Sequence, residues 1–147
     1  MGLLYSSSAN YICYTNNYEL KGHVKAMSLV DGSALDVLSA ARDKIHLGWK
    51  LMADPLYGNF KPNQQPYRTL VLRHPEDGAA ADMESLSLIE NSLAVYGASP
   101  VRRLPGDLPA DMDADFRYLD FVLMEDTFRV CGLLFSVIER ISGEVSL

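Results

Sequence analysis

The chain has 147 residues, of which 48% are hydrophobic and 22% charged, a composition typical of one globular domain, here expected over residues 1–147. The net charge of −6 argues against a nucleic-acid partner, because duplex binding needs a basic surface. Charged residues interrupt the longest apolar stretches, so we expect no membrane span. The N-terminus lacks the basic residues of a secretory signal, and a cytoplasmic protein is the resulting expectation.

The two cysteines give no sign of metal or redox chemistry. Cys13 and Cys131 each lie in an apolar segment, and neither belongs to a Cys-x-x-Cys pair. We interpret both as buried, unreactive thiols. No histidine stands at metal-ligand spacing from either cysteine, so the sequence predicts no metal site and no cofactor.

Two short strands are expected near the start of the chain. Residues 11–15 are aromatic and branched, and residues 26–30 are apolar and are followed by Asp31-Gly32 as a turn. The connection between them is too short for a crossover helix of about a dozen residues. The strands either pair as a loose hairpin or run parallel with a single helical turn between them, and the sequence does not distinguish the two.

A long amphipathic helix is predicted next. Ser33 is the expected N-cap, and Asp36 stands in the favourable first turn. Arg42 and His46 lie on the polar side at i, i+4 spacing. The apolar residues follow helical spacing and should face the core. They are Ala34, Val37, Leu38, Ala41, Ile45 and Trp49.

A proline-rich loop over residues 52–65 follows this helix. Pro55 and Pro62 restrict the backbone, so we expect an ordered loop. Residues 67–73 return to strand character. Strand, helix, loop and strand together predict a βαβ unit with parallel pairing and a right-handed crossover.

Two further helices are predicted. One carries an apolar stripe from Met83 to Tyr96 and stops at Gly97. The other begins near Asp113 and is apolar over much of its circumference, which predicts deep burial or a homodimer interface through residues 116–135. Gly132 is a candidate break in it, and Gly143 its expected end.

The elements together predict an α/β fold. It is a small three-layer, Rossmann-like domain with a short, mostly parallel sheet of about three to four strands and a long buried C-terminal helix.

The first candidate site combines basic and hydrogen-bonding residues of the long helix and the loop after it. If the loop folds back over its own helix, these side chains could converge on a small anion or on the acidic surface of a partner. The alternative is that they are solvated charges around a structural loop. The residues are Arg42, His46, Lys61, Asn63, Tyr67 and Arg68.

A second candidate is a row of carboxylates in the last helix, Asp120, Glu125 and Asp126. A carboxylate on an apolar face is costly unless it is paired. We therefore expect ion pairs with Arg117 and Arg129 within the helix. A general acid with a raised pKa is the alternative.

A third candidate is Thr15-Asn16-Asn17, at the end of the first strand. Ligands bind at the carboxyl ends of strands in open α/β sheets, which favours Asn16 as a ligand-binding residue. Asn-Asn is equally a common turn former. The chain lacks the G-x-G-x-x-G, Walker A, G-x-S-x-G and H-E-x-x-H patterns, so nucleotide-binding, hydrolase and metalloprotease functions have no support from motifs.

Three segments of the chain resemble the GrdX family. They are TNN after the first strand, ARDKIHLGWKLMADPLYGNFKP, and NQQPYRTL. Trp49 and Asp54 stand where the family pattern has histidines, so the resemblance implies no metal site here. The matching residues are Arg42, Asp43, Ile45, His46, Gly48, Pro55, Leu56, Gly58, Lys61, Pro62, Asn63, Pro66 and Tyr67.

The GrdX family consists of small proteins encoded beside the glycine, sarcosine and betaine reductase components of amino-acid-fermenting anaerobic bacteria. The resemblance therefore implies an accessory role in such a system, through binding of a reductase component or a small anionic ligand. A small enzyme acting on a carboxylate- or phosphate-bearing metabolite is the alternative. The expected binding residues are Arg42, His46, Lys61, Asn63, Tyr67 and Asn16.

Overall fold

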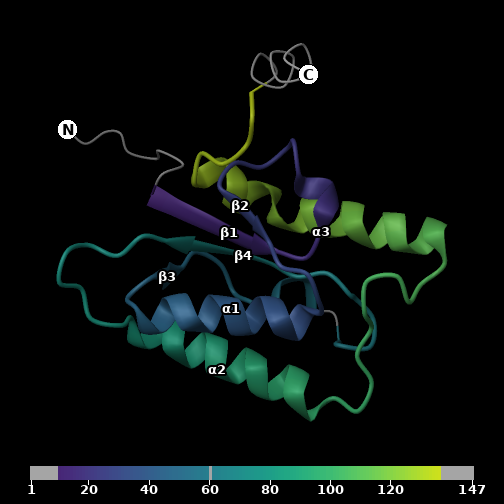
Figure 1. Cartoon of the computed structure of the whole chain (residues 1–147), viewed down its shortest axis with the longest axis horizontal. Helices are drawn as coiled ribbons and strands as arrows, with labels where there is room; N and C mark the ends of the chain where they lie inside the picture. The colour runs from purple at the N-terminus through teal and green to yellow at the C-terminus, as the bar shows by residue number, and fades with distance from the viewer. Residues whose placement is uncertain (1–9, 60, 137–147) are drawn as a thin grey trace.

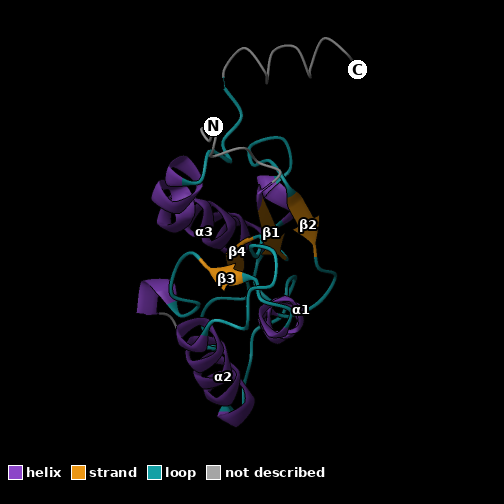
Figure 2. Cartoon of the chain, turned by 90° about the vertical axis from the view of Figure 1, so that its left-hand side faces the viewer, coloured by secondary structure: helices purple, strands orange, loops and turns teal. Residues whose placement is uncertain are grey.

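A four-stranded mixed sheet lies between helices on its two faces (Figure 1 and Figure 2). The structure, a computed structural model, describes residues 10–59 and 61–136. Helix α3 (Ala110–Val130) covers one face of the sheet, and helices α1 (Ala34–His46) and α2 (Met83–Ala98) lie on the other, as Figure 1 and Figure 2 show. Within these residues, no helix combines the length and the hydropathy that crossing a membrane requires.

The sheet has the strand order β2-β1-β4-β3. Its strands are β1 (Tyr11–Thr15), β2 (Met27–Leu29), β3 (Lys50–Leu51) and β4 (Thr69–Arg73). β1 and β2 are parallel, with the 3₁₀ turn η3 (Tyr18–Leu20) between them, so the second of the two expected arrangements is correct. β4 runs antiparallel to both β1 and β3. The α/β fold with a sheet of about three to four strands is therefore confirmed, whereas the predicted mostly parallel sheet and the βαβ unit with parallel pairing were wrong.

The error traces to β3, which the sequence pattern did not reveal. Helix α1 (Ala34–His46) ends just before Gly48, whose φ of +100° turns the chain into Lys50–Leu51. This strand, β3, follows α1 directly and pairs antiparallel with β4. The proline-rich loop therefore connects two neighbouring antiparallel strands. A strand of two residues is too short to show a hydrophobic period.

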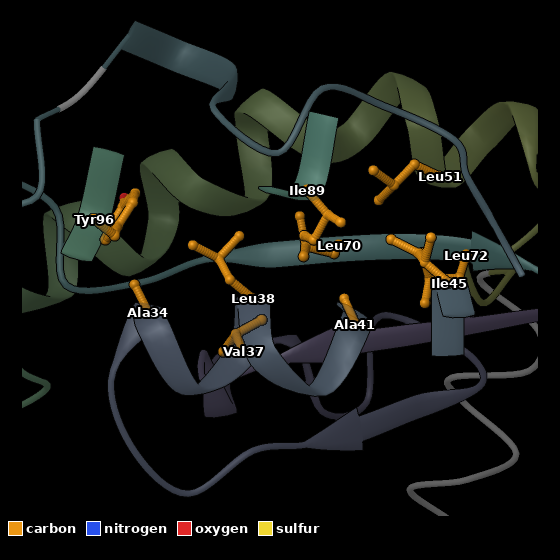
Figure 3. Packing of buried hydrophobic residues seen from close by; sticks show 10 residues of the cluster. All are labelled: Ala34, Val37, Leu38, Ala41, Ile45, Leu51, Leu70, Leu72, Ile89 and Tyr96. Carbon is orange, nitrogen blue, oxygen red and sulfur yellow. The ribbon is translucent and has the colours of Figure 1, made fainter. Parts of the chain in front are cut away.

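Helix α1 follows its sequence closely. Ser33 caps it in a capping box: the Ser33 backbone N–H donates to Asp36 Oδ2 at 2.8 Å, and the Asp36 N–H donates to Ser33 Oγ at 3.3 Å. The predicted stripe from Ala34 to Ile45 is buried, while Trp49 lies beyond the end of the helix. Figure 3 shows this stripe packed against β4 and residues of α2.

Helix α2 (Met83–Ala98) packs on α1 and exposes the first residue of its predicted stripe. The Met83 side chain is 75% exposed. Two serines of α2 are buried instead, and one of them contacts β3, where Ser85 Oγ accepts a hydrogen bond from the Leu51 N–H at 2.9 Å. A small hydroxyl allows the close approach of a strand that needs an acceptor. The buried residues of α2 are Ser85, Ile89, Ser92 and Tyr96.

Helix α3 (Ala110–Val130) is buried along one side only, so the prediction of a deeply buried helix was wrong. Tyr118 and Val130 are 67% and 77% exposed. The buried residues are Asp113, Asp120, Met124 and Phe128. Gly132, at φ +69°, follows the end of the helix and confirms the predicted break, whereas Gly143 lies outside the described residues.

The carboxyl-terminal half of α3 packs into a second apolar cluster, on the face of the sheet that α3 covers (Figure 1 and Figure 2). Phe128 and Met124 lie there with Cys13 of β1 and Cys131. Both cysteines are free and buried, as predicted. Burial, and secondarily the charge of Asp120, raises the pKa of the Cys13 thiol far above its usual value, so it stays protonated and unreactive.

Candidate functional site

Arg42 and His46 are paired with helix α2. Arg42 Nε lies 2.8 Å from Glu90 Oε2, and His46 Nε2 lies 3.8 Å from the same oxygen. All three side chains are about half exposed. These contacts join the two helices at the surface, on the side of the sheet opposite to α3 (Figure 1).

Lys61 and Asn63 lie on the exposed loop before β4. The Lys61 N–H donates to Gln64 Oε1 at 2.9 Å. Arg103, from the connection between α2 and α3, donates through its backbone N–H to the Pro62 oxygen at 3.0 Å and through Nε to the Asn63 oxygen at 3.2 Å. Two loops distant in sequence thus hold each other in place.

Tyr67 and Asn16 are buried and have structural partners. The Tyr67 hydroxyl lies 2.8 and 2.9 Å from the two carboxylate oxygens of Asp113 in α3. Asn16 Nδ2 donates to the oxygens of Gly32 and Pro66 at 3.1 and 2.9 Å, and Asn16 Oδ1 accepts from the Arg68 N–H at 2.9 Å. Asn16 thereby ties the end of β1 to the starts of α1 and β4.

These contacts divide the six predicted residues into separate groups. Arg42 and His46 face α2, whereas the Tyr67 hydroxyl reaches α3 on the other side of the sheet. The proline-rich loop folds against β4 and Arg103 and makes no hydrogen bond or ion pair with Arg42 or His46 among the described residues. A ligand-binding role for these residues remains a prediction.

Asp120 is the centre of a buried polar network that the sequence did not predict. It is fully buried on α3 and accepts hydrogen bonds from Asn17 Nδ2 at 3.0 Å and from Thr69 Oγ1 at 2.6 Å. The Tyr57 hydroxyl makes a short hydrogen bond to its other oxygen. Donors from the N-cap of η3, the proline-rich loop and β4 therefore satisfy one carboxylate.

The hydroxyls around Asp120 have defined directions. Because Thr69 donates its proton to Asp120, Thr15 must donate in the 2.8 Å contact between Thr15 Oγ1 and Thr69 Oγ1. Thr15 Oγ1 in turn accepts from the Asn17 N–H at 2.9 Å. Tyr57 accepts from the Thr69 N–H at 2.7 Å while it donates to Asp120. Such a chain orients every member.

The predicted ion pairs of α3 are correct in part. Arg129 lies 3.2 Å from Glu125 and 2.8 Å from Asp126, as expected. Arg117 pairs with Asp113 and, at 2.7 Å, with Glu19 of η3. The expected pairing of Asp120 with an arginine of its own helix was therefore wrong, because α3 turns Asp120 inward toward neutral donors.

Arg68 is fully buried just before β4. Its Nη1 donates to the backbone oxygens of Pro55 and Tyr57 at 2.9 and 3.1 Å. Its Cζ lies 4.2 Å from the centroid of the Tyr57 ring and 5.9 Å from that of Tyr96 in α2. Arg68 Nε and Nη2 and the Tyr96 hydroxyl are buried and have no hydrogen-bond partner among the described residues.

The two tyrosines beside Arg68 remain neutral. Burial, reinforced by the charge of Asp120, raises the pKa of Tyr57 well above its usual value, although Arg68 opposes the shift. Burial also raises the pKa of Tyr96, again against the influence of Arg68. Both hydroxyls therefore keep a proton to donate at neutral pH.

The sequence contains one signal for the buried cluster of Arg68, Tyr57 and Tyr96. Arg68 directly precedes β4, whose first four residues are buried, and a buried charge is costly unless it is paired and hydrogen-bonded. The partners Pro55, Tyr57 and Tyr96 come from the loop and from α2, and no spacing rule connects them. Among the described residues, no group of three or more His, Cys, Asp or Glu side chains is arranged to hold a metal ion.

Comparisons with known proteins identify a family. No curated protein and no solved structure matches the chain. A family model described as "GrdX-like protein" matches residues 12–129, which include α1, the proline-rich loop, β4 and α3 nearly to its end. Since the match spans most of the sequence, the chain belongs to the GrdX-like protein family.

Proposed function

We propose that this protein is an accessory protein of a glycine, sarcosine or betaine reductase system and that it docks on an acidic surface of a reductase component. Membership of the GrdX-like family supports the link to such a system. The observation that carries the docking role is a basic surface built from two interlocked loops. This surface, called the basic loop surface below, consists of Lys61, Asn63, Gln64, Arg102 and Arg103.

The basic loop surface is exposed and held in place. Its five residues are all exposed. Arg103 fixes the loop by donating to the backbone oxygens of Pro62 and Asn63. Arg102 Nη1 donates to the backbone oxygen of Tyr96 at 3.1 Å. A preorganised loop loses little conformational entropy when a partner binds.

The charge of this surface contrasts with the rest of the chain. The net charge is −6, yet Lys61, Arg102 and Arg103 gather on adjoining loops and form no ion pair among the described residues. A cationic patch on an acidic protein orients an acidic partner and disfavours other docking modes. The exposed side-chain amides of Asn63 and Gln64 add hydrogen-bonding groups for specificity.

The test is affinity capture from cells growing on glycine or betaine. We expect the tagged protein to retain a reductase component, and the double variant Lys61→Glu/Arg103→Glu to lose it. The matched control is Lys21→Glu/Lys50→Glu, which changes the net charge equally at exposed positions outside the surface. Higher salt should weaken capture of the component, because charged contacts at an interface are screened.

Two results would contradict the proposal. One is that the unmodified protein recovers no reductase component under these conditions. The other is equal capture by the two double variants, which would place the interface elsewhere. Circular dichroism of both variants shows whether the fold is retained, so a loss of capture is not mistaken for unfolding.

A further inference from the structure

Two buried side chains from different elements present donors without partners at the same place. Within residues 10–59 and 61–136, Arg68 Nε and Nη2 are buried and have no hydrogen-bond partner, and the same holds for the hydroxyl of Tyr96. The Arg68 Cζ lies 5.9 Å from the centroid of the Tyr96 ring. A buried donor without an acceptor is costly, and more so when it carries charge. This pattern indicates that an acceptor belongs between them.

The free edge of Arg68 has a specific shape. In a guanidinium, the N–H of Nε and one N–H of Nη2 point in the same direction and form the fork that grips a carboxylate with two parallel hydrogen bonds. The other nitrogen, Nη1, is already held by the oxygens of Pro55 and Tyr57 at 2.9 and 3.1 Å. Arg68 is therefore fixed with its fork free.

We propose that this fork is a binding site for the carboxylate group of a small metabolite. Arg68 Nε and Nη2 donate to the two carboxylate oxygens, and the Tyr96 hydroxyl donates to one of them. The Tyr57 ring, 4.2 Å from the guanidinium carbon, covers one face of the group and limits the ligand to the plane of the fork. This site is separate from the basic loop surface and does not rest on the docking role.

The local charge favours a carboxylate over a phosphate. Arg68 supplies one positive charge, and the fully buried Asp120 lies at the hydroxyl end of the Tyr57 ring, bonded to that hydroxyl. A doubly charged phosphate would bring excess negative charge into this buried region, where repulsion is weakly screened. A planar, singly charged carboxylate matches both the fork and the charge of Arg68.

The burial of Arg68 restricts the size of the ligand. The side chain is fully buried, and the Pro55–Tyr57 backbone closes the Nη1 side of the group. Only a compact molecule fits such an enclosed position. Acetate, propionate and glycine are therefore suitable probes, and inorganic phosphate is the competing one.

The test is calorimetric titration of the full chain with these probes at constant ionic strength. We expect saturable binding of at least one carboxylate and weaker or no binding of phosphate. Tyr96→Phe removes only the unpaired hydroxyl and should weaken carboxylate binding about tenfold without loss of stability. The matched control is Tyr118→Phe, which removes an exposed hydroxyl on α3 and should leave binding unchanged.

Arg68→Lys adds a second measurement. It keeps the positive charge but removes the fork, so it should abolish the preference for carboxylates. If this variant does not fold, Tyr96→Phe alone decides. Absence of carboxylate binding, a preference for phosphate, or unchanged affinity in Tyr96→Phe would each overturn the proposal, as would a crystal structure grown with the carboxylate that shows only a water on the fork. Because capture of a reductase component depends on other residues, failure here leaves the docking role untouched.

Discussion

The guanidinium carbon of Arg68 lies 4.2 Å from the centroid of the Tyr57 ring, whose hydroxyl bonds to Asp120. One tyrosine thus contacts two fully buried groups of opposite charge, Arg68 over the face of its ring and Asp120 at its hydroxyl. The face of the ring attracts the cation, by about 2 kcal/mol when the pair is desolvated, and its hydroxyl satisfies the anion. Tyr57 therefore links the proline-rich loop to β4 and to α3.

Tyr57→Phe should destabilise the protein while keeping the ring over Arg68. The change removes one donor from Asp120 and the acceptor of the Thr69 N–H. Leaving two buried groups short of partners should lower the free energy of unfolding by about 2–4 kcal/mol. The midpoint of urea unfolding measures this loss.

The control for that variant is Tyr118→Phe. Tyr118 is 67% exposed, so its change should stay within about 0.5 kcal/mol. Equal free energies of unfolding for the two variants would mean that the hydrogen bonds of the Tyr57 hydroxyl make no net contribution to stability.

Alkaline pH should destabilise the protein through its buried tyrosines. Burial is the main cause that raises the pKa of Tyr57, of Tyr67 and of Tyr96. In the unfolded chain these groups lose protons near pH 10, while the folded protein still holds them. The unfolded state then binds fewer protons, so the free energy of unfolding falls as pH rises above about 10.

Absorbance titration of tyrosinate and unfolding at a series of pH values measure this effect. The buried tyrosines should ionise only above pH 10 or together with unfolding. Tyr57→Phe should make the fall in stability shallower above pH 10. A stability that stays level from pH 9 to pH 12 would contradict the assignment of neutral, buried phenols.

The parts of the fold that the sequence predicted well depend on neighbouring residues. The start of α1 follows from Ser33 and Asp36, three positions apart, and its buried side follows from helical spacing. β1 was predicted with its observed bounds, because aromatic and branched residues stand between polar segments. β3 was missed because two residues carry no period, and the direction of pairing between the strands around α1 was predicted wrongly as a consequence.

The candidate site was harder to predict because its contacts cross long stretches of chain. Asp120 meets Asn17 and Thr69, which lie 103 and 51 positions away. The polar side of α1 was identified, but the sequence did not show that Glu90 of α2 would pair with Arg42. Helical spacing predicts which residues share one face of a helix. It does not predict which other element that face contacts.

Arg42→Ala and Tyr67→Phe should differ strongly in their effects on stability. Arg42 pairs with Glu90 where both side chains are about half exposed, and such pairs contribute about 0–1 kcal/mol. The hydroxyl of the fully buried Tyr67 bonds to the carboxylate of Asp113. Its loss should cost about 1–3 kcal/mol. Thermal unfolding of both variants measures the contrast, and a larger loss for Arg42→Ala would contradict it.

Gly32→Ala should destabilise the start of α1 for a steric reason. Gly32 has a φ of +153°, and a Cβ at this position would overlap the carboxylate of Asp36. That carboxylate accepts from the Ser33 N–H at 2.8 Å in the capping box. Displacing it should cost about 1–2 kcal/mol, the usual value of a helix cap. Chemical unfolding measures the loss.

A double-mutant cycle separates this overlap from backbone strain. If the overlap with Asp36 is the cause, Gly32→Ala should cost much less in an Asp36→Ala background than in the unmodified protein. Gly22→Ala serves as the strain control, because Gly22 has a φ of +88° and nothing lies within 4 Å of an added Cβ. Full additivity of Gly32→Ala and Asp36→Ala would instead assign the loss to the backbone of Gly32, whose oxygen also accepts from Asn16 Nδ2.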